Sequence, residues 1–504
     1  MKKNREIICG LTAWVLTVCF FLSCLLIPGL SERISEHGNI NILVYGMTLV
    51  LFCILFLAGM AWSTSRQNNS LKLTESPVAK KTALVILLGS QLPFWIVCVT
   101  RETEQVGTVS MKYGWHTQPL AVMILLFLAE LAVFFWLYEN LSLTEKKGEW
   151  IIWLTYAALV VLIFYCMYTP NIYGRGEQGD NYHAHAYFNS VYNVYQGVPY
   201  THNVTSIYGH YGLFFKIPMK LVHGDFRVFV LMMAGLGALT YIGAFLVLQM
   251  LVRSRILRVI AAFALAFPVL GMRGGYYWQV WPHRVLFPVL LLLYGMVILK
   301  KKRSSLLTAA GGYLICLLAI LWNTETGLLL TVSWAGLYIS RLLSRKKWKI
   351  RELLFSIGAQ IVGMILAFTG AYGIVNLYNL SKHSPMNSVK DFLIPLLSDG
   401  YMTDILHLDL PTYPSAYMAV ITLFLTGVAM GIAGWFGDRE ERRWETDLIF
   451  MLSVGALGCL VYYMNRPSYH NLDCISISAV LLAAYLAQHG LDFVKKNGWK
   501  NIAR

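Results

Sequence analysis

Long apolar runs, separated by short polar bridges, follow one another along nearly the whole chain. A run of about 20 apolar residues crosses about 30 Å of hydrocarbon as a helix. Runs of this kind begin near residues 6, 41, 82, 118, 150, 227, 257, 284, 305, 326, 353, 414, 447 and 472. The pattern therefore predicts an all-α polytopic membrane protein with about fourteen transmembrane helices.

The composition excludes a water-soluble protein of this size. Hydrophobic residues make up 57% of the 504 residues and charged residues only 13%, and the mean hydropathy is +0.57. The nine cysteines lie in or beside apolar runs and form no CxxC pair, which indicates buried thiols rather than disulfides or a zinc site. The net charge of +15 does not indicate nucleic-acid binding, because the basic residues lie in short bridges where they set membrane topology.

The positions of the basic residues predict the orientation of the chain. If the N-terminus is cytoplasmic and the runs alternate sides, 29 of the 41 basic residues fall on the cytoplasmic side, as the positive-inside rule requires. Both termini are then cytoplasmic. The polar loops that meet on the outer face are 169–227, 273–284, the turn at Glu325, 378–413 and 465–471.

The outer loop 169–227 contains the densest chemistry of the chain. Asp180 lies between flexible glycines and an aromatic run that extends to Gln196. This pattern predicts a helix that begins near Asp180 and lies along the membrane interface. On such a helix Asp180, His183 and Tyr187 share a face. A carboxylate partly shielded from water can take a proton from an acceptor hydroxyl. Alternatively, Asp180 only caps the helix.

Two further motifs of this loop have both a functional and a structural interpretation. His183 and His185, with Glu177, could hold a divalent cation such as Mg²⁺ or Mn²⁺, or they form ordinary hydrogen bonds. The stretch Tyr208-Gly209-His210-Tyr211-Gly212 favours close backbone approach and aromatic stacking on a sugar, or belongs to the aromatic belt of the interface.

Cationic side chains in very short outer turns are candidates for binding a phosphate. An arginine at such a position needs an anion, and a phosphate accepts the guanidinium fork in two hydrogen bonds; lipid headgroups offer the same group. Glu325 lies in a four-residue turn and either pairs with one of these arginines or orients an acceptor. The candidate donor-phosphate ligands are Arg273, Arg284, Arg466 and His470.

At these residues the chain resembles the GT-C superfamily of polyprenyl-phosphate-sugar-dependent glycosyltransferases. The similar residues are Asp180, Ala186-Tyr187, Gly197-x-Pro199-Tyr200, Tyr208-Gly209 and Pro218. The resemblance implies that Asp180 is the catalytic base of an inverting transfer, and that Glu325 and Arg466 position the acceptor and the donor phosphate. The residues expected to contact substrate are His183, Tyr187, Tyr208, His210 and Glu325. The resemblance covers residues 150–504, which implies that residues 1–149 are an N-terminal extension of four spans.

The predicted function is therefore transfer of a sugar from a polyprenyl-phosphate donor to a glycan, lipid or protein acceptor. It would take place on the outer face of a bacterial cytoplasmic membrane, and no cofactor beyond the divalent cation is expected. The alternatives are a lipid-linked oligosaccharide flippase and a polysaccharide polymerase or ligase. A carrier for charged headgroups needs a polar central cavity, whereas the spans contain almost no acidic residue besides Glu130.

Overall fold

The computed structural model describes residues 2–65, 102–106, 109–113, 149–168, 181–200, 208–271, 278–301, 305–345, 348–397, 410–412, 415–436 and 444–497. The helices are α1 (Lys2–Leu26), α2 (Pro28–Ser35), α3 (Ile40–Ser65), α6 (Glu149–Tyr168), α7 (Asn181–Gln196), α8 (Gly212–Leu221), α9 (Phe226–Leu251), α10 (Arg255–Gly271), α11 (Leu286–Lys300), α12 (Leu306–Trp322), α13 (Thr324–Leu343), α14 (Ile350–Leu380), α15 (Val389–Phe392), α16 (Ile394–Leu397), α18 (Ala416–Ala433), α19 (Trp444–Cys459), α20 (Val461–Asn465), α21 (Tyr469–Leu472), the 3₁₀ helix η4 (Asp473–Ile475) and α22 (Ser476–Asn497).

The predicted apolar runs form helices wherever the structure describes them. Twelve of the runs fall on described residues, and each coincides with a helix. Among the described residues, nine helices are long and apolar enough to cross a membrane, and α11 and α12 are shorter apolar helices. The runs that begin near residues 82 and 118 lie outside the described residues. The chain is thus a polytopic helical protein suited to a membrane.

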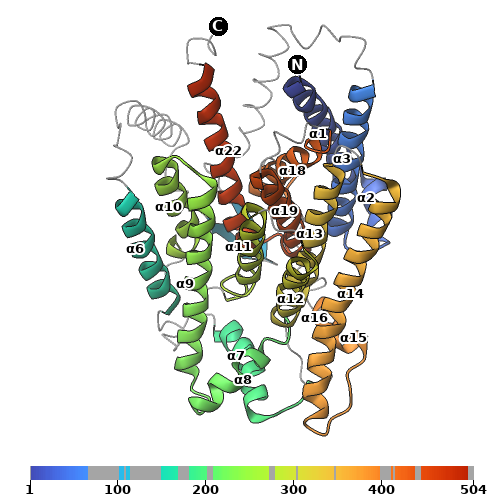
Figure 1. Cartoon of the computed structure of the whole chain (residues 1–504). Helices are drawn as coiled ribbons and strands as arrows, with labels where there is room; N and C mark the ends of the chain where they lie inside the picture. Colours follow the sequence, from blue (N-terminus) through green and yellow to red (C-terminus); the bar gives the residue numbers. More distant parts are fainter. Residues whose placement is uncertain are drawn as a thin grey trace.

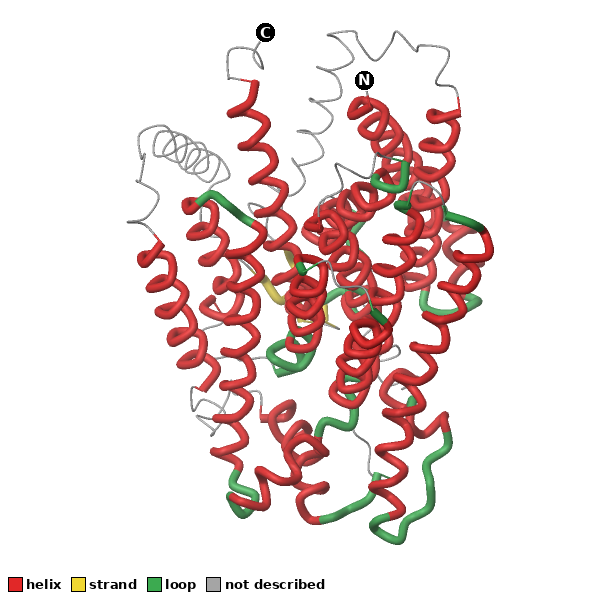
Figure 2. Tube along the Cα trace, viewed as in Figure 1, coloured by secondary structure: helices red, strands yellow, loops and turns green. Residues whose placement is uncertain are grey.

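One short hairpin departs from the all-helical prediction. Strands β1 (Glu102–Val106) and β2 (Val109–Tyr113) pair antiparallel, with Glu102 opposite Tyr113 and Val106 opposite Val109, and Figure 2 shows them in yellow. β-branched residues such as Thr103 and Val109 favour strands. The short separation of the two segments lets them pair with each other.

The helices form an elongated bundle whose two ends differ. Both chain termini lie at one end, and α7 and α8 lie at the opposite end (Figure 1). α19 is mostly buried in the centre, packed against α13 and α18. α14 is mostly exposed along its apolar length, with Phe355 and Leu366 on its surface. This distribution places α14 where lipid would surround it and α19 where other helices do.

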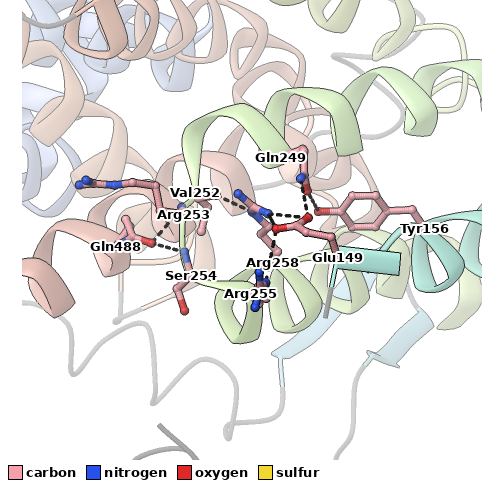
Figure 3. Close-up of polar contacts among 9 residues, drawn as sticks. All are labelled: Glu149, Tyr156, Gln249, Val252, Arg253, Ser254, Arg255, Arg258 and Gln488. Carbon is pink, nitrogen blue, oxygen red and sulfur yellow. Dashed lines mark hydrogen bonds and ion pairs between the residues drawn. The ribbon is translucent and has the colours of Figure 1, made fainter. Parts of the chain in front are cut away.

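A network of charged and polar side chains joins four helices (Figure 3). Arg258 of α10 donates from one guanidinium nitrogen to both carboxylate oxygens of Glu149 of α6, at 3.0 and 3.2 Å. Gln249 of α9 donates to the same carboxylate at 3.1 Å. Gln488 of α22 accepts from the backbone N–H groups of Arg253 and Ser254, at 3.0 and 2.7 Å. The basic bridge after α9 therefore holds α6, α9, α10 and α22 in place.

We expect Glu149→Gln to lower the free energy of unfolding by about 1–2 kcal/mol, because it leaves the buried Arg258 guanidinium without its carboxylate. The partial exposure of Glu149 keeps the loss below that of a fully buried pair. Thermal unfolding of the purified protein in detergent measures it. Asp492→Asn is the control, since its partner Arg253 is mostly exposed, and it should change stability by less than about 0.5 kcal/mol. Equal losses in both variants would contradict the assignment.

Candidate functional site

A buried ion pair lies near the end of the bundle that carries α7 and α8. Arg284 belongs to the turn before α11, and Glu325 to the first turn of α13. The Arg284 Nη2 donates to Glu325 Oε2 at 2.9 Å, and Nη1 donates to the carbonyl oxygen of Gln279 at 3.2 Å. The side chain of Arg284 is 4% exposed and that of Glu325 24%. The Glu325 carboxylate therefore pairs with a buried cation and is itself partly accessible.

Two tyrosines fix the plane of the Arg284 guanidinium. Its central carbon lies 3.5 Å from the ring centre of Tyr462 and 5.1 Å from that of Tyr208. The Tyr462 hydroxyl donates to the side-chain oxygen of Gln279 at 2.6 Å. A desolvated cation–π contact contributes about 2 kcal/mol. Arg284 is thus held in place, and part of its fork is directed at Glu325 rather than toward an external phosphate.

The corner between α12 and α13 places Glu325. α12 ends at Trp322, and the side chain of Asn323 caps α13 by accepting from the N–H of Thr326 at 2.8 Å. Trp322 Nε1 donates to the carbonyl oxygen of His283 at 2.9 Å, which ties the corner to the turn of Arg284. A carboxylate in the first turn of a helix also interacts favourably with the helix dipole. The cap and the tryptophan thus set the distance between the two charged groups.

The segment Tyr208–Tyr211 docks on this corner through its backbone. The N–H of Thr324 donates to the carbonyl of Tyr208 at 3.1 Å, and the N–H of His210 donates to that of Leu321 at 2.7 Å. A Cβ on Gly209 would lie 2.6 Å from the carbonyl oxygen of Trp322. At Gly209 the close approach is to the chain's own backbone, and the stacking of a sugar on this stretch stays a prediction.

Tyr187 attaches α7 to the same cluster. Its ring is fully buried. The centre of this ring lies 5.4 Å from the ring centres of Tyr208 and Tyr211 and 5.1 Å from that of His283. The predicted end of this helix at Gln196 is confirmed, and Gly197 follows with a φ of +84°. Tyr187 therefore packs α7 onto the turn of Arg284, a position in the core rather than on a substrate-facing surface.

His210 is a core residue, unlike the predicted substrate ligand. It is buried, its ring stacks on Phe392 at 4.7 Å with an angle of 4°, and it meets the edge of Tyr200 at 4.9 Å. Burial lowers the pKa of His210 to about 3. A neutral imidazole enclosed by rings stabilises the loop by packing, and the histidine does not reach a substrate from there.

Several predicted site residues lie outside what the structure describes. Asp180, Glu177, Arg273 and Glu130 are outside the described residues. His183 and His185 lie in α7, and His470 in α21, as backbone without described side chains. Among the described residues, no group of three or more His, Cys, Asp or Glu could hold a metal ion. The divalent cation and the catalytic base therefore stay predictions.

Arg466 is half-buried in the turn after α20. Its carbonyl oxygen accepts from Asn471 Nδ2 at 2.8 Å. Its Nε is buried and has no hydrogen-bond partner among the described residues. Arg466 thus remains a candidate for an anionic ligand.

The structure adds three residues that the sequence did not single out. Gln279 and Tyr462 complete the surroundings of Arg284, as described above. His283 is buried among Tyr187, Tyr211 and Trp322, and neither ring nitrogen has a partner among the described residues. Burial and the neighbouring Arg284 lower the pKa of His283 well below its usual value. The aromatic density of the turn 273–284 was the only sequence signal for Gln279 and His283, and Tyr462 of α20 had none.

We expect Gly209→Ala to destabilise the protein by about 1–3 kcal/mol, because the added methyl group collides with backbone that cannot move aside. Gly235→Ala on α9 is the matched control, since no atom lies within 4 Å of its new methyl group. The control should be neutral or stabilising by roughly 0.5 kcal/mol. Thermal unfolding in detergent distinguishes the two, and equal behaviour would contradict the docking of this loop.

We expect Glu325→Gln to lower the free energy of unfolding by about 2 kcal/mol, because the buried Arg284 loses its only described counter-ion. Glu352→Gln is the control: Glu352 also lies in the first turn of a helix, α14, but is exposed. It should cost less than about 0.5 kcal/mol. Denaturant unfolding monitored by tryptophan fluorescence reports both, and a harmless Glu325→Gln would show that the pair is not a structural constraint.

Comparisons with known proteins leave the site to be interpreted from its own residues. No protein-family model, curated protein or solved structure matches the chain. The likeness to the GT-C superfamily therefore rests on the sequence motifs alone, and a fold by itself does not specify an activity.

Proposed function

We propose that this protein is a membrane glycosyltransferase that moves a sugar from a polyprenyl-phosphate donor to an acceptor hydroxyl. One observation carries the proposal. α7, whose first residue follows Asp180 in the sequence, packs through Tyr187 onto the turn of Arg284, and Arg284 pairs with Glu325. The start of α7 thus belongs to the same end of the bundle as a partly accessible carboxylate and a fixed cation.

Each group has a separate role in the proposed reaction. Asp180 takes the proton of the acceptor hydroxyl, and the oxygen attacks the anomeric carbon of the donor sugar. The bond from that carbon to the phosphate oxygen breaks, and the polyprenyl phosphate leaves with the bonding electrons. Glu325, held by Arg284, accepts a hydrogen bond from a sugar hydroxyl. Arg466 stabilises the negative charge on the departing phosphate.

The orientation of the site follows from the basic bridges. Arg253, Arg255 and Arg258 lie where α9 leads into α10 (Figure 3), at the end of α9 that lies away from α8 (Figure 1). Positive residues favour the cytoplasmic side. The end with α7 and the Arg284–Glu325 pair then faces outward, where a lipid-linked sugar supplies both the activated donor and its own leaving group.

We expect Asp180→Asn to reduce sugar transfer by about 10²-fold or more, because the amide keeps the size and helix-capping ability of the carboxylate but cannot accept the proton. Transfer of labelled sugar from a polyprenyl-phosphate donor pool in membranes measures the rate at matched expression.

Asp225→Asn is the matched control for this experiment. Asp225 caps α9 in the same outer loop, where its side chain accepts from the N–H of Arg227 at 2.7 Å, and asparagine caps equally well. The control should keep wild-type transfer. Unchanged transfer by Asp180→Asn would show that Asp180 only caps the helix. No transfer by the wild type with any donor would favour a lipid-linked oligosaccharide carrier.

A further inference from the structure

Lysines gather where the end of α7, helix α8 and the end of α14 meet. The ammonium of Lys216 on α8 lies 4.8 Å from the ring centre of Tyr378 on α14. Lys382, just after α14, lies so close to Gly197 that a Cβ there would be 2.9 Å from its Nζ. Lys220 follows Lys216 by one helical turn. These three lysines are called the α8 lysine cluster below.

No carboxylate among the described residues forms an ion pair with these lysines. The pKa of Lys216 is lowered first by burial, and also by the positive charges of Lys382 and Lys220. A bound anion would offset the repulsion among these lysines.

Hydrogen bonds fix the backbone next to Lys382. Asn379 is buried and binds Tyr200, accepting from its N–H at 2.8 Å and donating to its carbonyl at 2.7 Å. The Tyr378 hydroxyl donates to the carbonyl of Val198 at 2.9 Å. The segment after α7 is therefore fixed to α14 beside Lys382, which limits the backbone ordering that ligand binding would require.

Exposed aliphatic side chains stand beside the lysines on α8. Ile217 is 70% exposed and Leu221 77% exposed, and the two are one turn apart, each next in sequence to a lysine. A helix with cations and bare aliphatic side chains is typical of the membrane interface. A soluble phosphate would use only the lysines, whereas a lipid with an anionic headgroup would use both kinds of side chain.

We propose that Lys216 and Lys382 bind the phosphate headgroup of an anionic membrane phospholipid, with its acyl chain against Ile217 and Leu221. The site fixes α8 to the outer leaflet and does not depend on glycosyl transfer. Asp180→Asn should accordingly leave lipid binding unchanged, so that the two proposals fail independently.

Native mass spectrometry of the full-length protein in detergent, titrated with phosphatidylglycerol or phosphatidylcholine, tests the site. The wild type should prefer phosphatidylglycerol. The double variant Lys216→Gln/Lys382→Gln should bind it about 30-fold more weakly, since each lysine near a membrane surface contributes roughly a factor of five. Lys216→Arg/Lys382→Arg should retain binding, which separates loss of charge from loss of fold.

Lys300→Gln/Lys301→Gln is the matched control, because it removes the same charge at the C-terminal end of α11. It should leave the preference for phosphatidylglycerol in place. The proposal is overturned if both double glutamine variants lose binding equally, or if neither does. It is also overturned if the cluster binds polyprenyl phosphate but not phosphatidylglycerol.

Discussion

The burial of Arg284 is the constraint on which the end of the bundle with α7 and α8 depends. A guanidinium removed from water must find a counter-ion and hydrogen-bond acceptors, or the desolvation cost destabilises the fold. Glu325 comes from the corner before α13, Gln279 from the turn that carries Arg284, and Tyr462 from α20. Three distant segments must therefore meet at one point, and their meeting sets the surface on which α7 and the Tyr208 segment dock.

A second buried arginine, Arg258, is also paired with a carboxylate. Arg258 and Glu149 join α10 to α6, as Figure 3 shows. An ionised side chain removed from water is costly, so each buried cation needs such a partner. α19 is mostly buried and packs against α13 and α18. Paired charges and close packing together hold the helices in a fixed arrangement.

The two proposals assign different chemistry to neighbouring parts of this end. Asp180, Glu325 and Arg466 would act on the sugar and its phosphate, whereas the α8 lysine cluster would hold a lipid of the surrounding leaflet. The two hydrogen bonds between Asn379 and Tyr200 connect them, because they fix Tyr200, which follows α7, to α14. A helix anchored to the leaflet would then keep the start of α7 at a constant depth relative to a lipid-linked donor.

The amino-acid sequence alone predicts the helical runs, the alternation of basic bridges with polar loops and the end of α7 at Gln196. Hydrophobicity, charge and glycine act on each segment locally, so their effects can be predicted without knowing its neighbours. The pairing of Arg284 with Glu325 and the burial of Tyr187 and His210 arise only in the folded chain. Those outcomes depend on partners more than 30 residues away, and an exposed aromatic or histidine has the same sequence signature as a buried one.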